Sequence, residues 1–200
     1  MTSSPTISLR SGATDVMIFF GLWLQRPLAI AATNPSGVRL ADAVARCIDF
    51  SRPGPVLELG AGTGSLTNGL LRAGCPPGRI IAFEREPRLA DVLRRKFPKI
   101  TVIEDDATQV GHHITSISRL CGVISSLPIK WFPLRAQRAI VYPCLDLLGP
   151  TGSFLQLTNA FSSPLPTSQL GIAGREIGRV WFNLLPTQIW SYSEPPKPAQ

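Results

Sequence analysis

The sequence has few charged residues, few cysteines and few histidines. Only 16% of its 200 residues are charged, and the four cysteines are widely spaced, with no Cys-x-x-Cys pair among them. This spacing favours a reduced protein with buried thiols and argues against a zinc site. The two histidines, His112 and His113, are adjacent and cannot form the i, i+4 pair of a helical metal site. We therefore expect no metal.

The sequence also lacks a long apolar run. The longest, Val16–Leu24, has nine residues. As a helix it would rise about 13 Å, whereas the hydrocarbon core of a bilayer is about 30 Å thick. A spanning helix is excluded for this run. The polar first dozen residues lack the basic cluster and apolar core of a secretory signal, so we expect none there.

Positive charge and apolar residues are abundant instead. Twenty Lys and Arg against 13 Asp and Glu give a net charge of +7, and 44% of the residues are hydrophobic. The isoelectric point near 9.8 indicates a polyanionic partner, either nucleic acid or an anionic membrane. The mean hydropathy of +0.15 is high for a soluble protein, which predicts that some apolar surface faces something other than water.

Predicted strands and helices alternate along most of the chain. Strands are expected at 56–59, 79–83, 100–103, 122–125 and 153–158, and helices at 38–48, 65–73, 87–97, 108–119 and 133–148. This alternation predicts βαβ units and a parallel sheet. After a loop over 161–174, the segments 179–184 and 188–192 suit a closing pair of strands, one of them antiparallel.

The predicted fold class is therefore α/β, with a Rossmann-like, seven-stranded, mostly parallel sheet and helices on both faces. We assign residues 1–50 to an N-terminal helical extension that docks on a membrane and covers the ligand site. Residues 51–193 form the main domain. Residues 194–200 are rich in proline and are assigned to a disordered tail.

Residues 56–64 read Val-Leu-Glu-Leu-Gly-Ala-Gly-Thr-Gly and predict a buried strand that turns into a helix. The three glycines remove side chains where the backbone turns tightly and approaches a ligand. A dinucleotide-binding loop would need a glycine at the position of Ser65. The spacing, with Glu58 upstream, instead resembles the first motif of methyltransferases that use S-adenosyl-L-methionine (SAM). An ordinary strand-to-helix turn is the alternative.

Acidic residues follow the second and third predicted strands, as a SAM-binding sheet requires. Glu84 is placed to accept hydrogen bonds from both ribose hydroxyls, and Asp106 to accept one from the adenine amino group. Taken singly, each acid is better explained as a solvated loop residue, but the two together, in order and at strand ends, favour SAM. The predicted SAM-binding residues are Glu58, Gly60, Ala61, Gly62, Thr63, Gly64, Glu84, Arg85, Asp106, Ala107 and Ser125, with Asn34 and Ser36 closing the pocket.

Longer segments resemble one family. The resemblance runs from about Phe19 to Tyr192 and is carried by Pro27-Leu28, Asn34-Pro35-Ser36, the glycine loop, Ser126-Leu127-Pro128 and the stretch 179–190. These segments resemble the soluble bacterial phospholipid N-methyltransferases. The resemblance implies successive methyl transfers from SAM to phosphatidylethanolamine, toward phosphatidylcholine, with S-adenosyl-L-homocysteine as the other product. It also implies a cytoplasmic enzyme that docks peripherally on the cytoplasmic membrane.

The docking element implied by this resemblance is a helix from Ala13 to about Leu24, which is apolar around nearly its whole circumference. It either packs on the domain core or lies in the membrane interface. In the interfacial alternative, four apolar side chains enter the headgroup region and one basic side chain lies near the phosphates. These residues are Phe19, Phe20, Leu22 and Trp23, with Arg26 as the basic one.

The amine-binding pocket is predicted at the end of the fourth strand. Ser125, Ser126 and the carbonyl of Leu127 are its candidate catalytic groups, with Tyr142, Phe19 or Trp23 as aromatic walls; core packing is the alternative for the aromatics. RNA adenine dimethyltransferases share this layout but carry Asn-Leu-Pro-Tyr or Asn-Ile-Pro-Tyr where this chain has Ser-Leu-Pro-Ile. RNA is thus the rival acceptor, and an inactive SAM-fold binding module is the third alternative.

Overall fold

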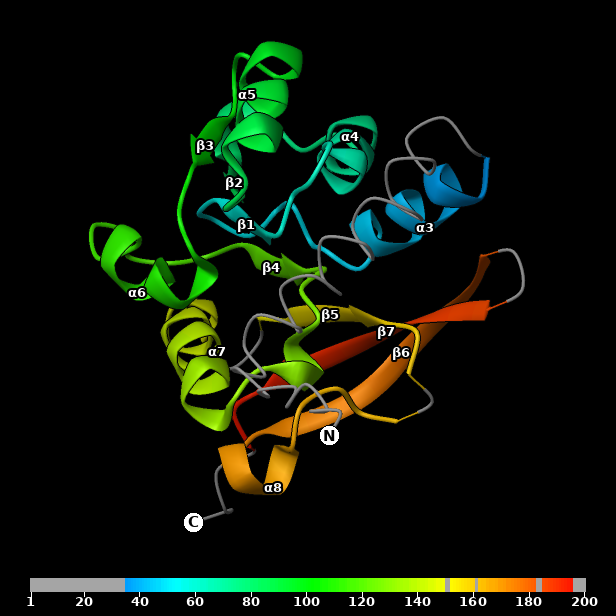
Figure 1. Ribbon diagram of the computed structural model, residues 1–200, viewed down its shortest axis with the longest axis vertical. Helices are drawn as coiled ribbons and strands as arrows, with labels where there is room; N and C mark the ends of the chain where they lie inside the picture. Colours follow the sequence, from blue (N-terminus) through cyan, green and yellow to red (C-terminus); the bar gives the residue numbers. More distant parts are fainter. Residues whose placement is uncertain (1–34, 150–151, 161, 183–184, 196–200) are drawn as a thin grey trace, which may run out of the picture.

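The computed structural model describes residues 35–149, 152–160, 162–182 and 185–195 (Figure 1). The helix predicted from Ala13 to Leu24 and the predicted site residue Asn34 lie outside the described residues. So do Phe19, Phe20, Leu22, Trp23 and Arg26, and for Ser36 only the backbone is described.

A seven-stranded sheet in the order β3-β2-β1-β4-β5-β7-β6 forms the centre of the protein. The first five strands are parallel, and β7 is antiparallel to both β5 and β6. Their bounds are β1 Val56–Leu59, β2 Ile80–Phe83, β3 Thr101–Ile103, β4 Gly122–Ser125, β5 Phe154–Thr158, β6 Ala173–Phe182 and β7 Leu185–Ser193. The predicted mostly parallel, Rossmann-like sheet is confirmed.

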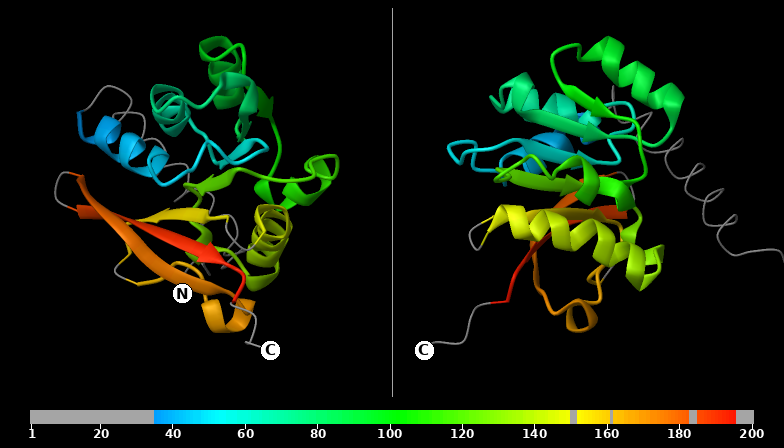
Figure 2. Two further views of the ribbon diagram at one scale, coloured as in Figure 1. Left: turned by 180° about the vertical axis from the view of Figure 1, so that it is seen from behind. Right: turned by 90° about the vertical axis from the view of Figure 1, so that its left-hand side faces the viewer.

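Helices cover both faces of this sheet (Figures 1 and 2). On one face lie α3 Pro35–Ala45, α4 Ser65–Arg72 and α5 Pro87–Lys96, and on the other lie α6 Val110–His113 and α7 Leu134–Leu148. A short helix, α8 Thr167–Leu170, joins β5 to β6. Residues Leu40, Ala41 and Val44 of α3 are buried against α4 and the sheet, so this helix belongs to the packed core.

Side chains line up in rows across the parallel strands, and the rows differ in polarity. Leu57, Val123, Phe154 and Tyr192 are register partners on the α7 face, and all four are fully buried. Each buried aliphatic side chain contributes about 1.5–3 kcal/mol to folding. The next row toward the carboxyl ends of the strands is Leu59, Ser125, Gln156 and Trp190. The sheet therefore becomes polar at the edge where parallel sheets bind ligands.

Three predicted elements differ from the structure. Helix α3 runs from Pro35 to Ala45 rather than from 38 to 48, because proline favours the first helical turn and the residues after Ala45 form tighter three-residue turns. The predicted helix 108–119 is wrong: a 3-10 turn, Ala107–Gln109, precedes α6, which ends at His113. Serine and threonine at 115, 116 and 118 compete for backbone hydrogen bonds there.

The third difference lies in the two last strands, which are longer than predicted. Residues 185–187, expected as a connection, open β7 instead. Pro186 is tolerated because it pairs only with Trp181 of β6, whereas β5 pairs with β7 no further than Gln188. All four cysteines are free and three of them are buried, as their spacing predicted.

Candidate active site

The glycine loop between β1 and α4 is built from backbone that only glycine adopts easily. Gly60, Gly62 and Gly64 have φ of 77°, 57° and 81°. A Cβ on Gly60 would lie 2.8 Å from the Leu127 side chain, and one on Gly64 would overlap the ring of Phe97. The predicted tight turn is confirmed, and no side chain fits at these two positions.

Two neighbouring strands hold this loop in place. The N–H groups of Gly60 and Ala61 donate to the Phe83 carbonyl at the end of β2, at 2.9 and 3.0 Å. From the segment after β4, the Ser126 hydroxyl donates to the Gly60 carbonyl at 2.7 Å. The carboxyl ends of β1, β2 and β4 thus meet at the loop, and Ser126, predicted to line the amine pocket, supports the loop directly.

Glu84 joins the glycine loop to the start of α5. Its side chain is buried, with 5% exposed. One carboxylate oxygen accepts from the Gly62 N–H and the other from the Glu86 N–H, both at 2.8 Å. A carboxylate oxygen has two lone pairs, so both oxygens retain capacity for ligand hydroxyls. The structure places Glu84 at the carboxyl end of β2, beside the loop, as predicted.

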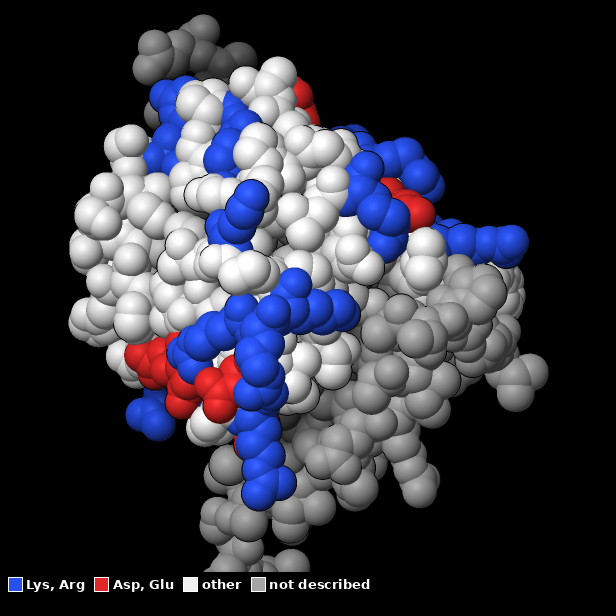
Figure 3. All heavy atoms as spheres, turned by 90° about the horizontal axis from the view of Figure 1, so that it is seen from above, with Lys and Arg blue, Asp and Glu red and all other residues white. Residues whose placement is uncertain are grey.

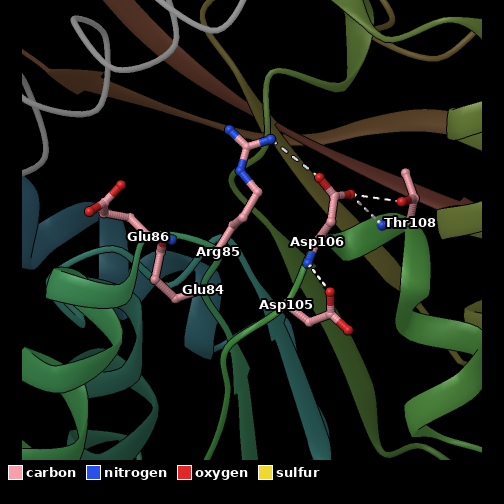
Figure 4. Close-up of polar contacts among 6 residues, drawn as sticks. All are labelled: Glu84, Arg85, Glu86, Asp105, Asp106 and Thr108. Atoms are coloured by element: carbon pink, nitrogen blue, oxygen red, sulfur yellow. Dashed lines mark hydrogen bonds and ion pairs between the residues drawn. The ribbon is translucent and has the colours of Figure 1, made fainter.

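Asp106 lies at the neighbouring strand end and is bonded to Thr108 and Arg85 (Figure 4). One oxygen accepts from the Thr108 N–H and hydroxyl at 2.9 and 2.8 Å, and the other accepts from the Arg85 guanidinium at 3.2 Å. Partial burial opposes ionisation, but the bonds from Thr108 and Arg85 together outweigh it and hold the pKa of Asp106 below its usual value. Asp106 is therefore a charged acceptor at neutral pH, and Ala107 begins the 3-10 turn behind it.

Glu58 has a different environment from the other two acids. It is fully buried in β1, and one oxygen accepts from the Thr67 hydroxyl of α4 at 2.6 Å. Burial raises its pKa to about 7; the Thr67 bonds oppose this shift and the nearby charge of Glu84 adds to it. Its Oε1 has no hydrogen-bond partner among the described residues, and neither has the Thr63 hydroxyl in the loop.

The groups predicted to line the amine pocket lie at the end of β4 and just after it. The Ser125 hydroxyl is buried and accepts weakly from the Leu127 N–H at 3.4 Å. The Leu127 carbonyl accepts from the side-chain amide of Gln156 at 2.8 Å. Ser125, Ser126 and Leu127 are therefore brought together beside the glycine loop.

Tyr142 is not brought to these groups by its contacts. Its hydroxyl, on α7, donates at 3.0 Å to the carbonyl of Leu170 in α8. Leu170 lies just before the start of β6, at the edge opposite the glycine loop, because β6 runs in the same direction as β1 to β5. The same opposite edge holds a cavity of about 340 Å³ lined by Cys47, Arg52 and Cys121 among others.

Two residues of the polar row were missed in the sequence. Gln156 lies within Phe-Leu-Gln-Leu-Thr, and a single glutamine in a buried apolar strand was the signal that could have identified it. Trp190 was noted only as part of the resemblance, and its place beside Gln156 depends on the antiparallel register of β7. The register that places Gln156 beside Ser125 and Trp190 beside Gln156 does not follow from the local sequence.

Basic side chains gather on α5 and the turn after it, next to the glycine loop. Helix α5 and the turn after it carry exposed Arg88, Arg94, Arg95, Lys96 and Lys99. The Lys96 ammonium also donates to the Thr63 carbonyl of the loop at 3.1 Å. Figure 3 shows that Lys and Arg outnumber Asp and Glu on the face seen from above, which is the α5 side. This face can attract an anionic partner.

Within the described ranges, no group of three or more His, Cys, Asp or Glu side chains is arranged to hold a metal ion. The helices of those ranges include none with both the length and the apolar character needed to cross a membrane.

Comparison with known proteins finds relatives of two kinds. No family model matches the chain. The ornithine lipid N-methyltransferase of Singulisphaera acidiphila is 32% identical over 149 residues, which cover 72% of this chain and 78% of that protein. Ribosomal RNA small subunit methyltransferase A of Anaeromyxobacter dehalogenans is 43% identical over 72 residues, which cover 36% of this chain and 24% of that protein.

Among solved structures, the 1,6-didemethyltoxoflavin-N1-methyltransferase of Burkholderia thailandensis has a TM-score of 0.62 with this chain at 16% identity. The match covers 96% of this chain and 94% of that one, whose structure contains 1,6-didemethyltoxoflavin and S-adenosylhomocysteine. At this identity the match shows a shared fold.

The residues at the glycine loop fit SAM. The loop leaves its backbone free of side chains, and two carboxylates lie near the ends of β2 and β3. The buried Thr63 hydroxyl has no hydrogen-bond partner among the described residues, and a ligand could supply one. Glu84 and Asp106 would hold the ribose and adenine ends, and Gly60 to Gly64 the amino-acid end.

Proposed function

Because the chain belongs to the family of SAM-dependent methyltransferases that includes the ornithine lipid N-methyltransferase of Singulisphaera acidiphila, we propose that it methylates the amine of a membrane lipid headgroup. The observation that carries this proposal is the 32% identity to that lipid methyltransferase over 72% of the chain. The match to the ribosomal RNA methyltransferase covers half as much of the chain.

Two lipids are the acceptors to test. Ornithine lipid is named by the relative, and phosphatidylethanolamine is implied by the motifs that resemble phospholipid N-methyltransferases. Both carry a primary amine. With phosphatidylethanolamine, successive transfers lead toward phosphatidylcholine.

Transfer of a methyl group to an amine depends mainly on how the two reactants are oriented. When bound, SAM supplies the methyl group: the amine lone pair forms the N–C bond as the S–C bond breaks, and one proton leaves for solvent. An amine with a lysine-like pKa of about 10.4 needs roughly 4–5 kcal/mol to lose a proton at pH 7. Positioning two reactants can supply about 7–11 kcal/mol. The chain therefore needs groups that hold the amine more than it needs a dedicated base.

We assign this role to the last residue of β4 and the segment that follows it. Ser125 and the Leu127 carbonyl offer hydrogen-bonding groups at the carboxyl edge, and Ser126 fixes their distance from the glycine loop through Gly60. In this proposal Ser125 and Leu127 face the amine, whereas Ser126 is a positioning residue.

A lipid acceptor requires that the protein reach a membrane surface. The basic residues of α5 suit an anionic surface, and two tryptophans, Trp131 and Trp181, are 67% and 69% exposed. Trp131 follows β4 and Trp181 lies near the end of β6, so both extend from the carboxyl edge of the sheet. Tryptophan prefers the headgroup region of bilayers. We extend the proposal to a cytoplasmic protein attached peripherally to the cytoplasmic membrane, with the helix 13–24 as a further contact.

One assay tests the function. Purified protein is incubated with methyl-labelled SAM and separately offered ornithine lipid vesicles, phosphatidylethanolamine vesicles and ribosomal RNA. Label in either lipid supports the proposal and identifies the acceptor. Label in RNA alone would overturn it in favour of RNA methylation, and binding of SAM without transfer to any acceptor would favour an inactive binding module. The Gly62→Asp variant is the control for transfer that depends on the glycine loop.

A further inference from the structure

Gln156 is a buried polar residue in the middle of an apolar strand. It lies in β5 between Leu155 and Leu157, and none of its side chain is exposed. Its Nε2 donates to the carbonyl oxygens of Leu127 and Leu157, both at 2.8 Å. Its Oε1 is buried and has no hydrogen-bond partner within the described segments. Because nearly all buried polar groups are paired, this oxygen calls for a partner beyond the described segments, which a bound ligand can supply.

The orientation of this amide follows from its partners. A carbonyl oxygen can only accept, so the group facing the Leu127 and Leu157 carbonyls must be the NH₂ end of the glutamine. The oxygen is thereby turned away from both carbonyls. The assignment of oxygen and nitrogen is thus determined by the hydrogen bonds.

Gln156 lies at the proposed acceptor site. Its register partners are Ser125 on β4 and Trp190 on β7, in the polar row at the carboxyl edge. Its amide also contacts Leu127, in the segment that joins this edge to the glycine loop. Trp190 is half-buried, and its ring stacks on that of Tyr192 with the centroids 6.2 Å apart. Its indole N–H donates to the side-chain oxygen of Gln188, so the indole is held in place within this row.

We propose that Oε1 of Gln156 accepts an N–H hydrogen bond from the acceptor amine, with the Leu127 carbonyl as the second acceptor and Trp190 as the adjoining wall. This inference rests on the proposed function and assigns its amine-binding group. The amide oxygen is neutral, so it orients an N–H without the strong preference for the ammonium form that a carboxylate would impose. An indole face also attracts the methylated ammonium product.

The proposal predicts a dependence on methylation state. A neutral primary amine has two N–H groups for the two acceptors, a monomethylated amine has one, and a dimethylated amine has none. The hydrogen bond to Gln156 is therefore made in the first transfer and is lost by the third. Because Oε1 of Gln156 is buried, the groups that cover it must move aside before the amine can reach it.

Gln137 provides a matched control within the same chain. It lies on α7 with 4% of its side chain exposed, and its Nε2 also donates to two carbonyls, those of Ile129 and Phe132, at 2.9 and 3.0 Å. Its Oε1 is likewise unpaired in the part of the chain that the structure describes. Gln137 is not in the polar row, since it is on a helix and bonds the turn after Pro128. Replacing either glutamine by methionine preserves length and removes both hydrogen-bonding groups.

The kinetic test compares Gln156→Met with Gln137→Met. We expect both variants to unfold at lower temperature than the wild type and to bind SAM within about twofold of it. Only Gln156→Met should lose activity on the unmethylated lipid, by about tenfold or more in kcat/KM, with a smaller loss on the dimethylated lipid. Equal kinetic effects of the two substitutions, or an equal loss on all methylation states, would overturn the proposal.

A binding measurement separates this inference from the function itself. The ¹⁵N-labelled protein with S-adenosyl-L-homocysteine is titrated with phosphoethanolamine or L-ornithine, and the glutamine side-chain amide resonances are followed, assigned by their loss in the two methionine variants. We expect a saturable shift for Gln156 and none for Gln137. Lipid turnover without a Gln156 shift would overturn the role of Gln156 and leave the function standing. A Gln156 shift without turnover of either lipid would overturn the function and support the amine site.

Discussion

The buried carboxyl of Glu58 makes the stability of the fold depend on pH. Its pKa is 4.5 when exposed and about 7 in the folded protein, chiefly because burial penalises the charged form. Below pH 4.5 both states bind the proton. Between pH 4.5 and 7 only the folded state keeps it, so the free energy of unfolding falls as pH rises, and above pH 7 the loss is complete.

The size of this effect follows from the two pKa values. One pKa unit corresponds to about 1.4 kcal/mol, so the step from 4.5 to about 7 removes on the order of 3 kcal/mol. That is a large share of the stability of a domain, about 5–15 kcal/mol. Glu58→Gln removes the ionisation while the glutamine oxygen can still accept from the Thr67 hydroxyl.

Urea unfolding of the wild type and Glu58→Gln at pH 5, 6, 7 and 8 measures the effect. We expect the wild type to lose about 2.5 kcal/mol relative to the variant over this range, because part of the step that begins at pH 4.5 is already complete at pH 5. Thr67→Val is the opposing control. It deletes a hydrogen bond that lowers the Glu58 pKa, so that pKa should rise further and the fall in the free energy of unfolding should extend to higher pH. Parallel curves for wild type and Glu58→Gln would refute the idea that Glu58 holds a proton in the folded state.

Three further predictions concern the loop and the membrane. Gly64→Ala should lower the free energy of unfolding by about 2 kcal/mol or more and weaken SAM binding, because φ is 81° and the Phe97 ring occupies the space that the new methyl group needs. Gly78→Ala, with open space around it, should change neither quantity. Urea unfolding measures the stability, and calorimetry measures the affinity for SAM. Ser126→Ala should weaken SAM binding several-fold by freeing a loop carbonyl, and unchanged affinity in a calorimetric titration would count against that support. Trp131→Ala with Trp181→Ala should reduce flotation with anionic vesicles several-fold, and unchanged flotation would remove these side chains from the proposed membrane contact.

The sheet was predictable because its signals are local. Each of the five parallel strands is a short apolar run bounded by turn residues, and the glycines at 60, 62 and 64 mark a loop in which three residues have positive φ. The helix after residue 107 was mispredicted for the converse reason. Its length depends on competition between short polar side chains and the backbone, and periodicity does not report that competition.

The chemistry of the site was predictable only in part. Glu84 and Asp106 were singled out because Glu84 directly follows β2 and Asp106 comes shortly after β3, and parallel strands bring their carboxyl ends to one edge. Glu58 was assigned to SAM by motif, but the structure shows its bonded oxygen facing Thr67 of α4. Tyr142 was chosen for its residue type, and its hydroxyl is bonded to α8.

The sequence by itself determined the class of fold, the glycine turn after β1 and the acids near the ends of β2 and β3, because these depend on residues close together along the chain. Only the tertiary structure decided which side chains share the carboxyl edge of the sheet. Ser125, Gln156 and Trp190 are separated by about thirty residues each, and they form one row only through the parallel pairing of β4 with β5 and the antiparallel pairing of β5 with β7. Strand register is a long-range property, since it is selected by packing the whole sheet and not by any one segment.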